Sequence, residues 1–275
     1  MRPSAPVGLE SAREYLLSIV NRDRAAEGLS PVVMDQSAHR AGQVHADDMA
    51  RFGYTAHWGT DGSVPEQRYT EAGGEHLVFE NAACFFDGEE RELDPNPSFS
   101  AESLDRIQKA FMDEVPPNDG HRKNILNPRH THVGFGVARP VGIDQPCLTH
   151  EFVAAYGEYA KVPERGRRGQ KLEISGVVKA PAVFGGVGIG HDPLPKPMSP
   201  AELNQTSTYR MPTPYATYFP PGFVTPKPVK LEGTHFSLDL ALSRGPGRYS
   251  ISIWGRFPGS GDELTMTSLR TVLVK

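Results

Sequence analysis

Two neighbouring stretches of the sequence decide its fold, Gly120-His-Arg-Lys-Asn-Ile-Leu-Asn-Pro128 and His132-Val-Gly-Phe-Gly-Val137. The first lies in a segment, residues 118–128, that is rich in the turn-forming residues Asn, Asp, Gly and Pro. The second lies in an apolar run for which we predict a strand over residues 131–138, with another strand over residues 149–156. The sequence therefore places a turn immediately before a pair of strands.

Three amphipathic helices are predicted before these strands. Residues 9–27 carry apolar side chains at helical spacing and end at Gly28, which readily adopts the left-handed conformation of a helix end. Residues 36–52 carry small apolar side chains and stop at Gly53, and residues 103–115 end at two prolines. This order of elements predicts an α+β fold with a layered α–β–α arrangement.

The composition of the chain changes near residue 160. Eight of the ten histidines precede residue 151, whereas 14 of the 25 prolines follow residue 160. Alternating apolar residues predict strands at 172–178, 236–242, 249–253 and 268–274. We therefore expect a first domain at residues 1–160 and a small all-β sandwich of the immunoglobulin-like type at residues 161–275.

The overall composition, with 38% hydrophobic and 23% charged residues over 275 positions, is ordinary for a globular protein. The formal net charge of −4 argues against the basic surface of a nucleic-acid-binding protein. No stretch reaches the roughly 18 apolar residues of a membrane span, and the N-terminal residues lack the apolar segment of a signal peptide. Neither nucleic-acid binding nor a membrane span is expected.

The sequence contains two cysteines, Cys84 and Cys147. This number excludes a disulfide-rich scaffold, and the absence of a Cys-x-x-Cys motif argues against thiol redox chemistry and cysteine zinc clusters. A single disulfide and a pair of buried free thiols are both compatible with the sequence. Of the two, free thiols are the interpretation we favour.

Four candidate functional side chains lie in loops, in turns or near the ends of predicted elements in the first half of the chain. His57 lies in a loop after the second helix, Glu80 before an apolar run, Glu114 on the last turn of the third helix and His121 in the turn segment. Two imidazoles and two carboxylates suit a borderline cation such as Zn²⁺. The same groups can also act as general acids and bases near neutral pH. Each residue alone is more typical of a structural role, so the functional interpretation depends on the whole set.

Three further motifs are given structural interpretations. His150-Glu151 begins like a zincin motif but lacks the second histidine, so we predict a buried strand. Gly185-Gly-Val-Gly-Ile-Gly190 is followed by no helix that would make it a phosphate-binding loop, so we predict a flexible β connection. His130 and His132 flank a predicted strand, and surface or capping roles are expected for both.

The order of the motifs over residues 9–160 resembles the CAP superfamily, or SCP domain, of cysteine-rich secretory proteins, antigen 5 and plant pathogenesis-related 1 proteins. The resemblance is carried by Asn21–Leu29, Leu29–Asp35, Phe79-Glu-Asn-Ala82, Phe111-Met-Asp-Glu-Val115 and Gly120–Val137. Phe79 stands where the family usually has glycine. The shortage of cysteine and the form Gly120-His-Arg-Lys-Asn-Ile-Leu126 are similar to bacterial members.

The resemblance implies the CAP/SCP fold, a three-layer α-β-α sandwich, with an open cleft lined by His57, Glu80, Glu114 and His121. It implies that His57 and His121 hold a divalent metal such as zinc. Glu80 and Glu114 would then orient the histidines or position a water molecule, and they are the candidate catalytic residues. Members of the family have been linked to lipid or sterol binding, to defence and signalling, and occasionally to proteolysis.

We expect a secreted or extracytoplasmic protein whose cleft binds a divalent metal together with a ligand or partner, such as a lipid, a peptide or a cell-surface component. Two histidines make a weak, open site, whereas hydrolytic zinc sites usually have three protein ligands. A zinc-dependent hydrolase or peptidase that uses the same cleft is the alternative. A third interpretation is a structural adhesin in which the two histidines and two glutamates of the cleft have no function. The β domain would attach the protein to a surface or present the cleft to a partner.

Overall fold

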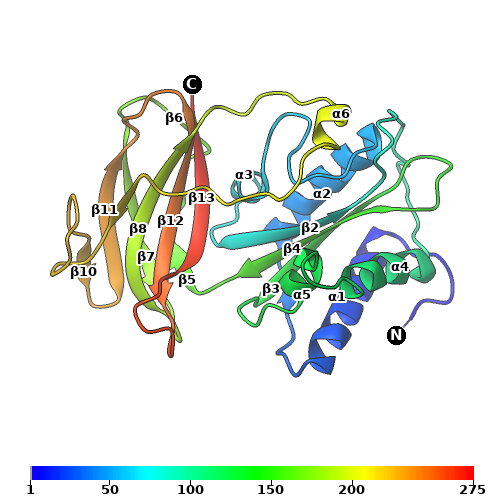
Figure 1. Ribbon diagram of the computed structural model, residues 1–275, viewed down its shortest axis with the longest axis horizontal. Coiled ribbons are helices and arrows are strands. Elements are labelled where there is room, and N and C mark those ends of the chain that lie inside the picture. Colours follow the sequence, from blue (N-terminus) through cyan, green and yellow to red (C-terminus); the bar gives the residue numbers. More distant parts are fainter. Residues whose placement is uncertain (1) are drawn as a thin grey trace. The chain divides into compact units, whose positions relative to one another are not determined.

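The computed structural model describes residues 2–275 (Figure 1). By contact, the chain divides into two compact units, each built from three segments. The first unit holds residues up to 68, 79–153 and 197–208, and the second holds 69–78, 154–196 and 209–275. Division into domains at 1–160 and 161–275 stays a prediction. The units show in addition that two short segments pack with the opposite half of the chain.

The helices of the chain are α1 (Leu9–Ala26), α2 (Gln36–Phe52), α3 (Pro65–Glu71), α4 (Ala101–Met112), α5 (Gly120–Ile125) and α6 (Pro200–Leu203). The first two predicted helices are confirmed. Helix α2 begins where the Asp35 side chain accepts a hydrogen bond from the Ala38 amide, and it ends at Gly53 in the left-handed conformation. The third predicted helix ends early, at Met112, so Glu114 lies beyond the helix and not on its last turn.

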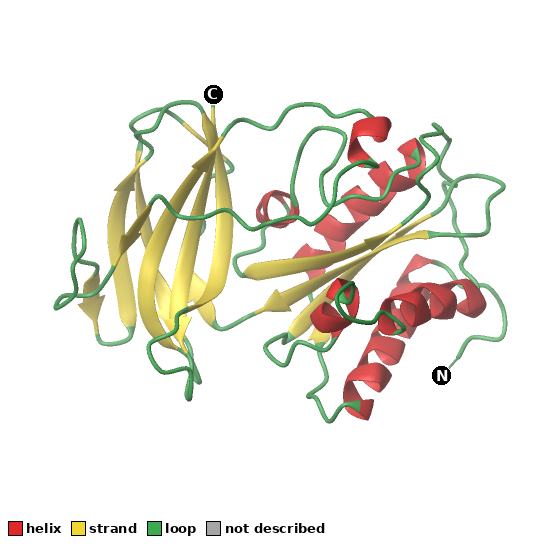
Figure 2. Ribbon diagram, viewed as in Figure 1, coloured by secondary structure: helices red, strands yellow, loops and turns green. Residues whose placement is uncertain are grey.

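Four strands form the sheet of the first unit, β1 (Val33–Met34), β2 (Leu77–Ala83), β3 (His132–Ala138) and β4 (Cys147–Ala154), in the order β1-β3-β4-β2. Strands β3 and β4 are the predicted pair and run antiparallel, with His132 opposite Val153. Figure 2 shows the helices, in red, around this sheet. The first unit thus combines helices with one mixed sheet, as the predicted α+β fold requires.

Alternation along β3 gives its two faces to different helices. Val133, Phe135 and Val137 pack in one apolar cluster with Leu16 of α1 and Leu104 of α4. On the other face, a Cβ atom added to Gly134 would overlap the backbone of Ala38, and one added to Gly136 would overlap the backbone of Gly42. Helix α2 therefore lies against β3 with no side chain between the two backbones.

This close approach gives a stability prediction. Gly136→Ala forces α2 away from β3, so we expect a loss of about 1–3 kcal/mol in the free energy of unfolding, measured by urea denaturation. Gly8→Ala is the matched control, because a Cβ atom at Gly8 meets nothing within 4 Å. Equal stability of Gly136→Ala and Gly8→Ala would show that the helix and strand are not packed backbone to backbone.

Cys84 and Cys147 form a disulfide, so the expectation of two free thiols is wrong. The bridge joins the chain just after β2 to the first residue of β4, strands that neighbour each other in the sheet. No local pattern indicates this pairing, because the two cysteines lie 63 residues apart and meet only through the sheet order.

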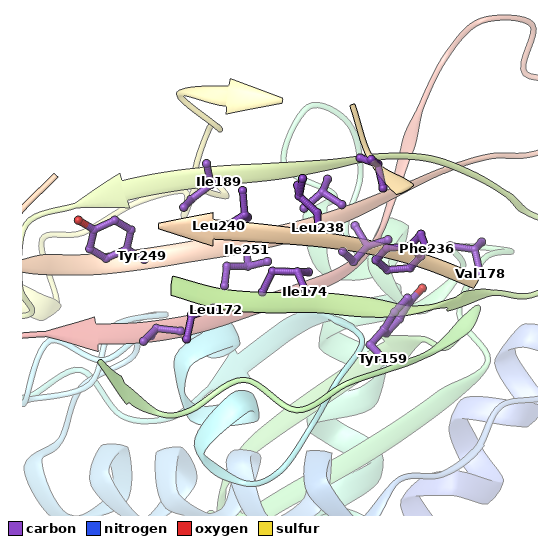
Figure 3. Close-up of a cluster of buried hydrophobic side chains, with 14 of the residues drawn as sticks. Tyr159, Leu172, Ile174, Val178, Ile189, Phe236, Leu238, Leu240, Tyr249 and Ile251 are labelled. Carbon is purple, nitrogen blue, oxygen red and sulfur yellow. The ribbon is translucent and has the colours of Figure 1, made fainter. Parts of the chain in front are cut away.

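The second unit is built on strands β5 (Gly157–Tyr159), β6 (Arg165–Gly166), β7 (Lys171–Val178), β8 (Val183–Asp192), β9 (Ala216–Tyr218), β10 (Lys230–Glu232), β11 (His235–Ala241), β12 (Gly247–Arg256) and β13 (Thr265–Val274). They form two sheets, in the orders β10-β11-β7-β5 and β6-β13-β12-β8-β9. One apolar core joins the sheets, with Ile174 and Leu238 from the first and Ile189 and Ile251 from the second (Figure 3). The predicted strands at 172–178, 236–242, 249–253 and 268–274 all lie in this assembly.

The prediction of a flexible connection at residues 185–190 is wrong, because this segment lies inside strand β8. Close packing explains why glycine stands at alternate positions of this strand. A Cβ atom on Gly188 would overlap the hydroxyl of Ser252 and lie 2.8 Å from Pro214, and one on Gly190 would overlap the hydroxyl of Ser250. The small residues thus let the proline-containing segment cross the strand closely.

Candidate functional site

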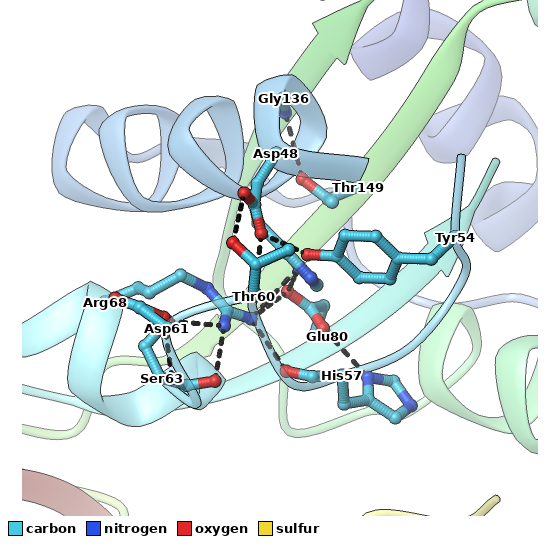
Figure 4. Close-up of polar contacts among 11 residues, drawn as sticks. Asp48, Tyr54, His57, Thr60, Asp61, Ser63, Arg68, Glu80, Gly136 and Thr149 are labelled. Carbon is cyan, nitrogen blue, oxygen red and sulfur yellow. Dashed lines mark hydrogen bonds and ion pairs between the residues drawn. The ribbon is translucent and has the colours of Figure 1, made fainter. Parts of the chain in front are cut away.

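The centre of the candidate site is the carboxylate of Glu80, on strand β2, whose side chain has no exposed surface. Its Oε1 atom accepts a hydrogen bond from Nδ1 of His57 at 2.8 Å. Its Oε2 atom accepts from Nδ1 of His45, on α2, at 2.7 Å. Figure 4 shows the His57 ring directed toward this carboxylate. Glu80 thus links the loop that carries His57 to the sheet and to α2.

Arg68, on α3, supplies the positive charge that this buried carboxylate needs. One of its terminal nitrogens donates to Glu80 Oε2 at 2.8 Å and to the backbone carbonyl of His57 at 3.1 Å, and the other donates to the carbonyl of Ser63 at 3.0 Å (Figure 4). Burial alone would raise the pKa of Glu80, but His45 and Arg68 hold it well below its usual range. Glu80 is therefore ionised, and both of its oxygens accept hydrogen bonds.

The Glu80 contacts fix the tautomer of both histidines. A carboxylate can only accept, so Nδ1 of each ring carries the proton and the lone pair of the neutral ring is on Nε2. For His45, burial and then the charge of Arg68 lower the pKa, so this ring is neutral. The His57 side chain is 25% exposed. In this tautomer the ring nitrogen with the lone pair, Nε2, is the one that does not contact Glu80.

Glu151, on β4, is a further buried acid beside Glu80. Burial first, and then the nearby charge of Glu80, raise the pKa of Glu151 well above its usual range. Glu151 is therefore a neutral acid at pH 7, next to an ionised one. Its place in a fully buried strand confirms the strand interpretation of His150-Glu151.

Glu114 and His121 form a second pair. Nδ1 of His121 donates to Glu114 Oε1 at 2.5 Å, and the backbone amides of His121 and Arg122 donate to Glu114 Oε2 at 2.8 and 3.3 Å. The Glu114 carboxylate thus accepts hydrogen bonds from backbone amides in the first turn of α5, which have no partner within the helix. The His121 side chain is 33% exposed, and its lone pair is again on Nε2.

Both pairs are attached to strand β2. His57 is hydrogen-bonded to Glu80. Asn81, which follows Glu80 in strand β2, donates from its side-chain amide to the backbone carbonyl of His121 at 3.2 Å. Asn81 also accepts from Asn124 of α5 at 2.8 Å. The four predicted residues therefore stand as two His–Glu pairs anchored on adjacent residues of one strand.

Within residues 2–275, no group of three or more His, Cys, Asp and Glu side chains is arranged to hold a metal ion. A cavity of about 400 Å³ lies beside the buried cluster, and its walls include His45, Arg68, Asp48 and Asp61. None of the four predicted residues lines this cavity.

Sequence reasoning missed His45, Arg68 and Glu151. His45 had a usable signal, since it lies on the same helical stripe as Ala38, Ala41 and Met49, all of which are buried. Val44, the apolar residue next to His45 in the sequence, is by contrast 62% exposed.

His130 and His150 of the first unit are also buried. His130 is 2% exposed, so the expected surface role is wrong. Its Nε2 atom donates to the Asn124 side chain at 2.8 Å, and its ring stacks on Phe152. His150 lies among the rings of Phe111, Phe135 and Phe152, and within residues 2–275 neither of its ring nitrogens has a hydrogen-bond partner.

Burial lowers the pKa of both His130 and His150 to about 3, with smaller contributions from Arg24 and His121 respectively. In the unfolded chain each titrates near 6.5, so below pH 6.5 the unfolded state takes up protons that the folded state does not. Stability is fully present above pH 6.5 and falls by about 1.4 kcal/mol per pH unit for each histidine as the pH drops toward 3.

Between pH 6.5 and pH 5 the free energy of unfolding of the wild type should fall. We predict that in His150→Leu this fall is smaller by about 2 kcal/mol. Denaturant unfolding at the two pH values measures the difference. His235→Ala, which removes an exposed histidine, is the control and should keep the wild-type dependence. An unchanged pH dependence in His150→Leu would mean that His150 is not buried as a neutral ring.

Comparison with known proteins agrees with this architecture. Residues 17–141 match the sequence model of the CAP family, described as the cysteine-rich secretory protein family. The uncharacterized protein YkwD of Bacillus subtilis (strain 168) is 26% identical over 133 residues, which are 48% of this chain and 45% of that protein. Residues 17–141 are therefore similar to a CAP domain, and the chain spans about half the length of the curated relative that it matches.

Two solved structures are similar to part of this chain at a low level. One is an extracellular protein containing a SCP domain from Bacillus anthracis str. Ames, with 20% identity, a TM-score of 0.40, and coverage of 52% of this chain and 40% of that one. The other is an outer surface protein from Borrelia burgdorferi, with 16% identity, a TM-score of 0.39, and coverage of 54% of this chain and 96% of that one.

Over residues 2–275, none of the helices combines the length and apolar character needed to cross a bilayer.

Proposed function

We propose that this protein binds a divalent cation such as Zn²⁺ through Nε2 of His57 and Nε2 of His121, at an open site that also receives a ligand or partner. One observation carries the proposal: each histidine donates its Nδ1–H to a glutamate, His57 to Glu80 and His121 to Glu114. Metal-binding histidines are held in this way by carboxylates, which fix the ring and raise the basicity of the ligating nitrogen.

The chemistry of the donors favours binding over hydrolysis. A bound zinc ion would supply Lewis acidity and could lower the pKa of a water molecule toward 7. A hydrolase would also need a general base, and both candidate carboxylates are engaged. Glu80 accepts from three side chains, and Glu114 accepts from one side chain and two backbone amides. Two protein ligands also fall short of the three that catalytic zinc sites usually have.

We further propose an extracytoplasmic location, which the Cys84–Cys147 disulfide supports. Disulfides persist in oxidising compartments and are rare in the cytosol. The ligand class stays at a lipid, a peptide or a cell-surface component, with the β-rich second unit as the part that attaches to a surface or presents the site to a partner.

Calorimetry tests the metal site. Wild-type protein should take up zinc, and His57→Ala/His121→Ala should lose most of that uptake, because both ligands are gone. His235→Ala, an exposed histidine of the second unit, should bind zinc like the wild type. Equal zinc uptake by the wild type and the double variant would overturn the proposal.

Turnover assays separate binding from hydrolysis. Zinc-loaded wild-type protein should release no product from a panel of peptides and esters, whereas Glu114→Gln should change only zinc uptake, through the weaker hold on the His121 ring. Zinc-dependent cleavage that disappears in Glu114→Gln would assign the hydrolase function instead.

A further inference from the structure

We propose that residues 197–208, which we name the strap, position His57 and so set the metal affinity of the site, with Asn204 as the positioning residue. The inference rests on the proposed function. The strap lies within the second half of the sequence, but it packs as part of the first unit, whereas residues 196 and 209 on either side of it belong to the second.

The strap is anchored by a buried side chain. Leu203, at the end of α6, has no exposed surface and packs in the apolar cluster that contains Met49 of α2, Tyr54 and Ala82 of β2. Helix α6 is fixed locally by a capping box, in which the Ser199 side chain accepts from the Glu202 amide and the Glu202 side chain accepts from the Ser199 amide. The strap therefore has a defined conformation where it meets the loop of His57.

Three hydrogen bonds then hold that loop, residues 53–60, at both ends. The side-chain oxygen of Asn204 accepts from the Thr55 amide at 3.0 Å, and its side-chain nitrogen donates to the Gly53 carbonyl at 3.2 Å. At the other end, the Met198 amide donates to the Thr60 carbonyl at 2.8 Å. His57 lies between these attachments.

The opposite side of the loop is attached near the disulfide. The Thr55 hydroxyl donates to the carbonyl of Phe85 at 3.0 Å and accepts from the amide of Cys84 at 3.0 Å. Thr55 is thus held between the strap and the cross-linked end of β2. Because His57 is two residues further along, the Asn204 contacts fix the backbone from which its ring reaches Glu80.

Asn204 suits the role better than its neighbours, because it alone in the strap supplies side-chain hydrogen bonds to residues 53–60 among those described. Gln205, the next residue, is exposed. No helix or strand is predicted for residues 197–208, and nothing in their local sequence pattern indicates a partner so far away in the chain.

The test compares Asn204→Ala, Asn204→Asp and Gln205→Ala in the full-length chain. Zinc affinity is measured by calorimetry, and hydrogen exchange of the Thr55 amide is measured in metal-free protein. Asn204→Ala should weaken zinc binding about tenfold, at the lower end of what outer partners of metal ligands contribute, and should speed Thr55 exchange while the amides of α2 and β3 stay protected. Asn204→Asp keeps the acceptor for Thr55 and should restore part of both properties. Gln205→Ala should match the wild type.

Unchanged zinc affinity and unchanged Thr55 exchange in Asn204→Ala would overturn the inference. So would equal changes in Gln205→Ala, or a general loss of protection throughout the first unit in both Asn204 variants. If the wild type takes up no zinc while Asn204→Ala still speeds Thr55 exchange, the proposed metal binding fails and the hold of the strap on the His57 loop stands.

Discussion

The structure of the first unit depends on the buried carboxylate of Glu80 and the three nitrogen donors around it. His45, His57 and Arg68 reach it from α2, from a loop and from α3, so one side chain joins three segments to strand β2. The ion pair with Arg68 makes this arrangement sensitive to change. Removal of one partner from a buried pair leaves an uncompensated charge and costs about 3–5 kcal/mol.

The same interaction relates stability to the proposed function. Glu80, which is the buried partner of Arg68, also holds the His57 ring by a hydrogen bond. Glu114, which accepts from backbone amides at the start of α5, also holds the His121 ring. Each carboxylate thus has a structural and an orienting role. Within the proposed function, this double use favours a binding role over a general-base role for both carboxylates.

Much of the fold was predictable where local signals were strong. Helices α1 and α2 end at glycines, Gly28 and Gly53, that adopt positive φ angles, and these positions are visible in the sequence. Four strands of the second unit, β7, β11, β12 and β13, follow from the alternation of apolar residues. By contrast, β8 was misread because its glycines, which are read locally as flexible, are required by the close packing of Ser250, Ser252 and Pro214.

The candidate site was predictable only in part. The resemblance supplied the two histidines and two glutamates, and the structure forms two pairs from them. The buried acid Glu151, the counter-charge Arg68 and the strap residue Asn204 come from elements far apart in the sequence, and their roles arise only from burial and three-dimensional neighbours. The disulfide was missed for the same reason.

The most direct test of the account is the tautomeric state of His57 and His121, read from the ¹⁵N chemical shifts of their ring nitrogens in metal-free protein at neutral pH. We predict that the neutral form of both rings carries the proton on Nδ1 and the lone pair on Nε2. Rings protonated on Nε2, or exchanging freely between the two tautomers, would contradict it, because Glu80 and Glu114 would then not orient the histidines.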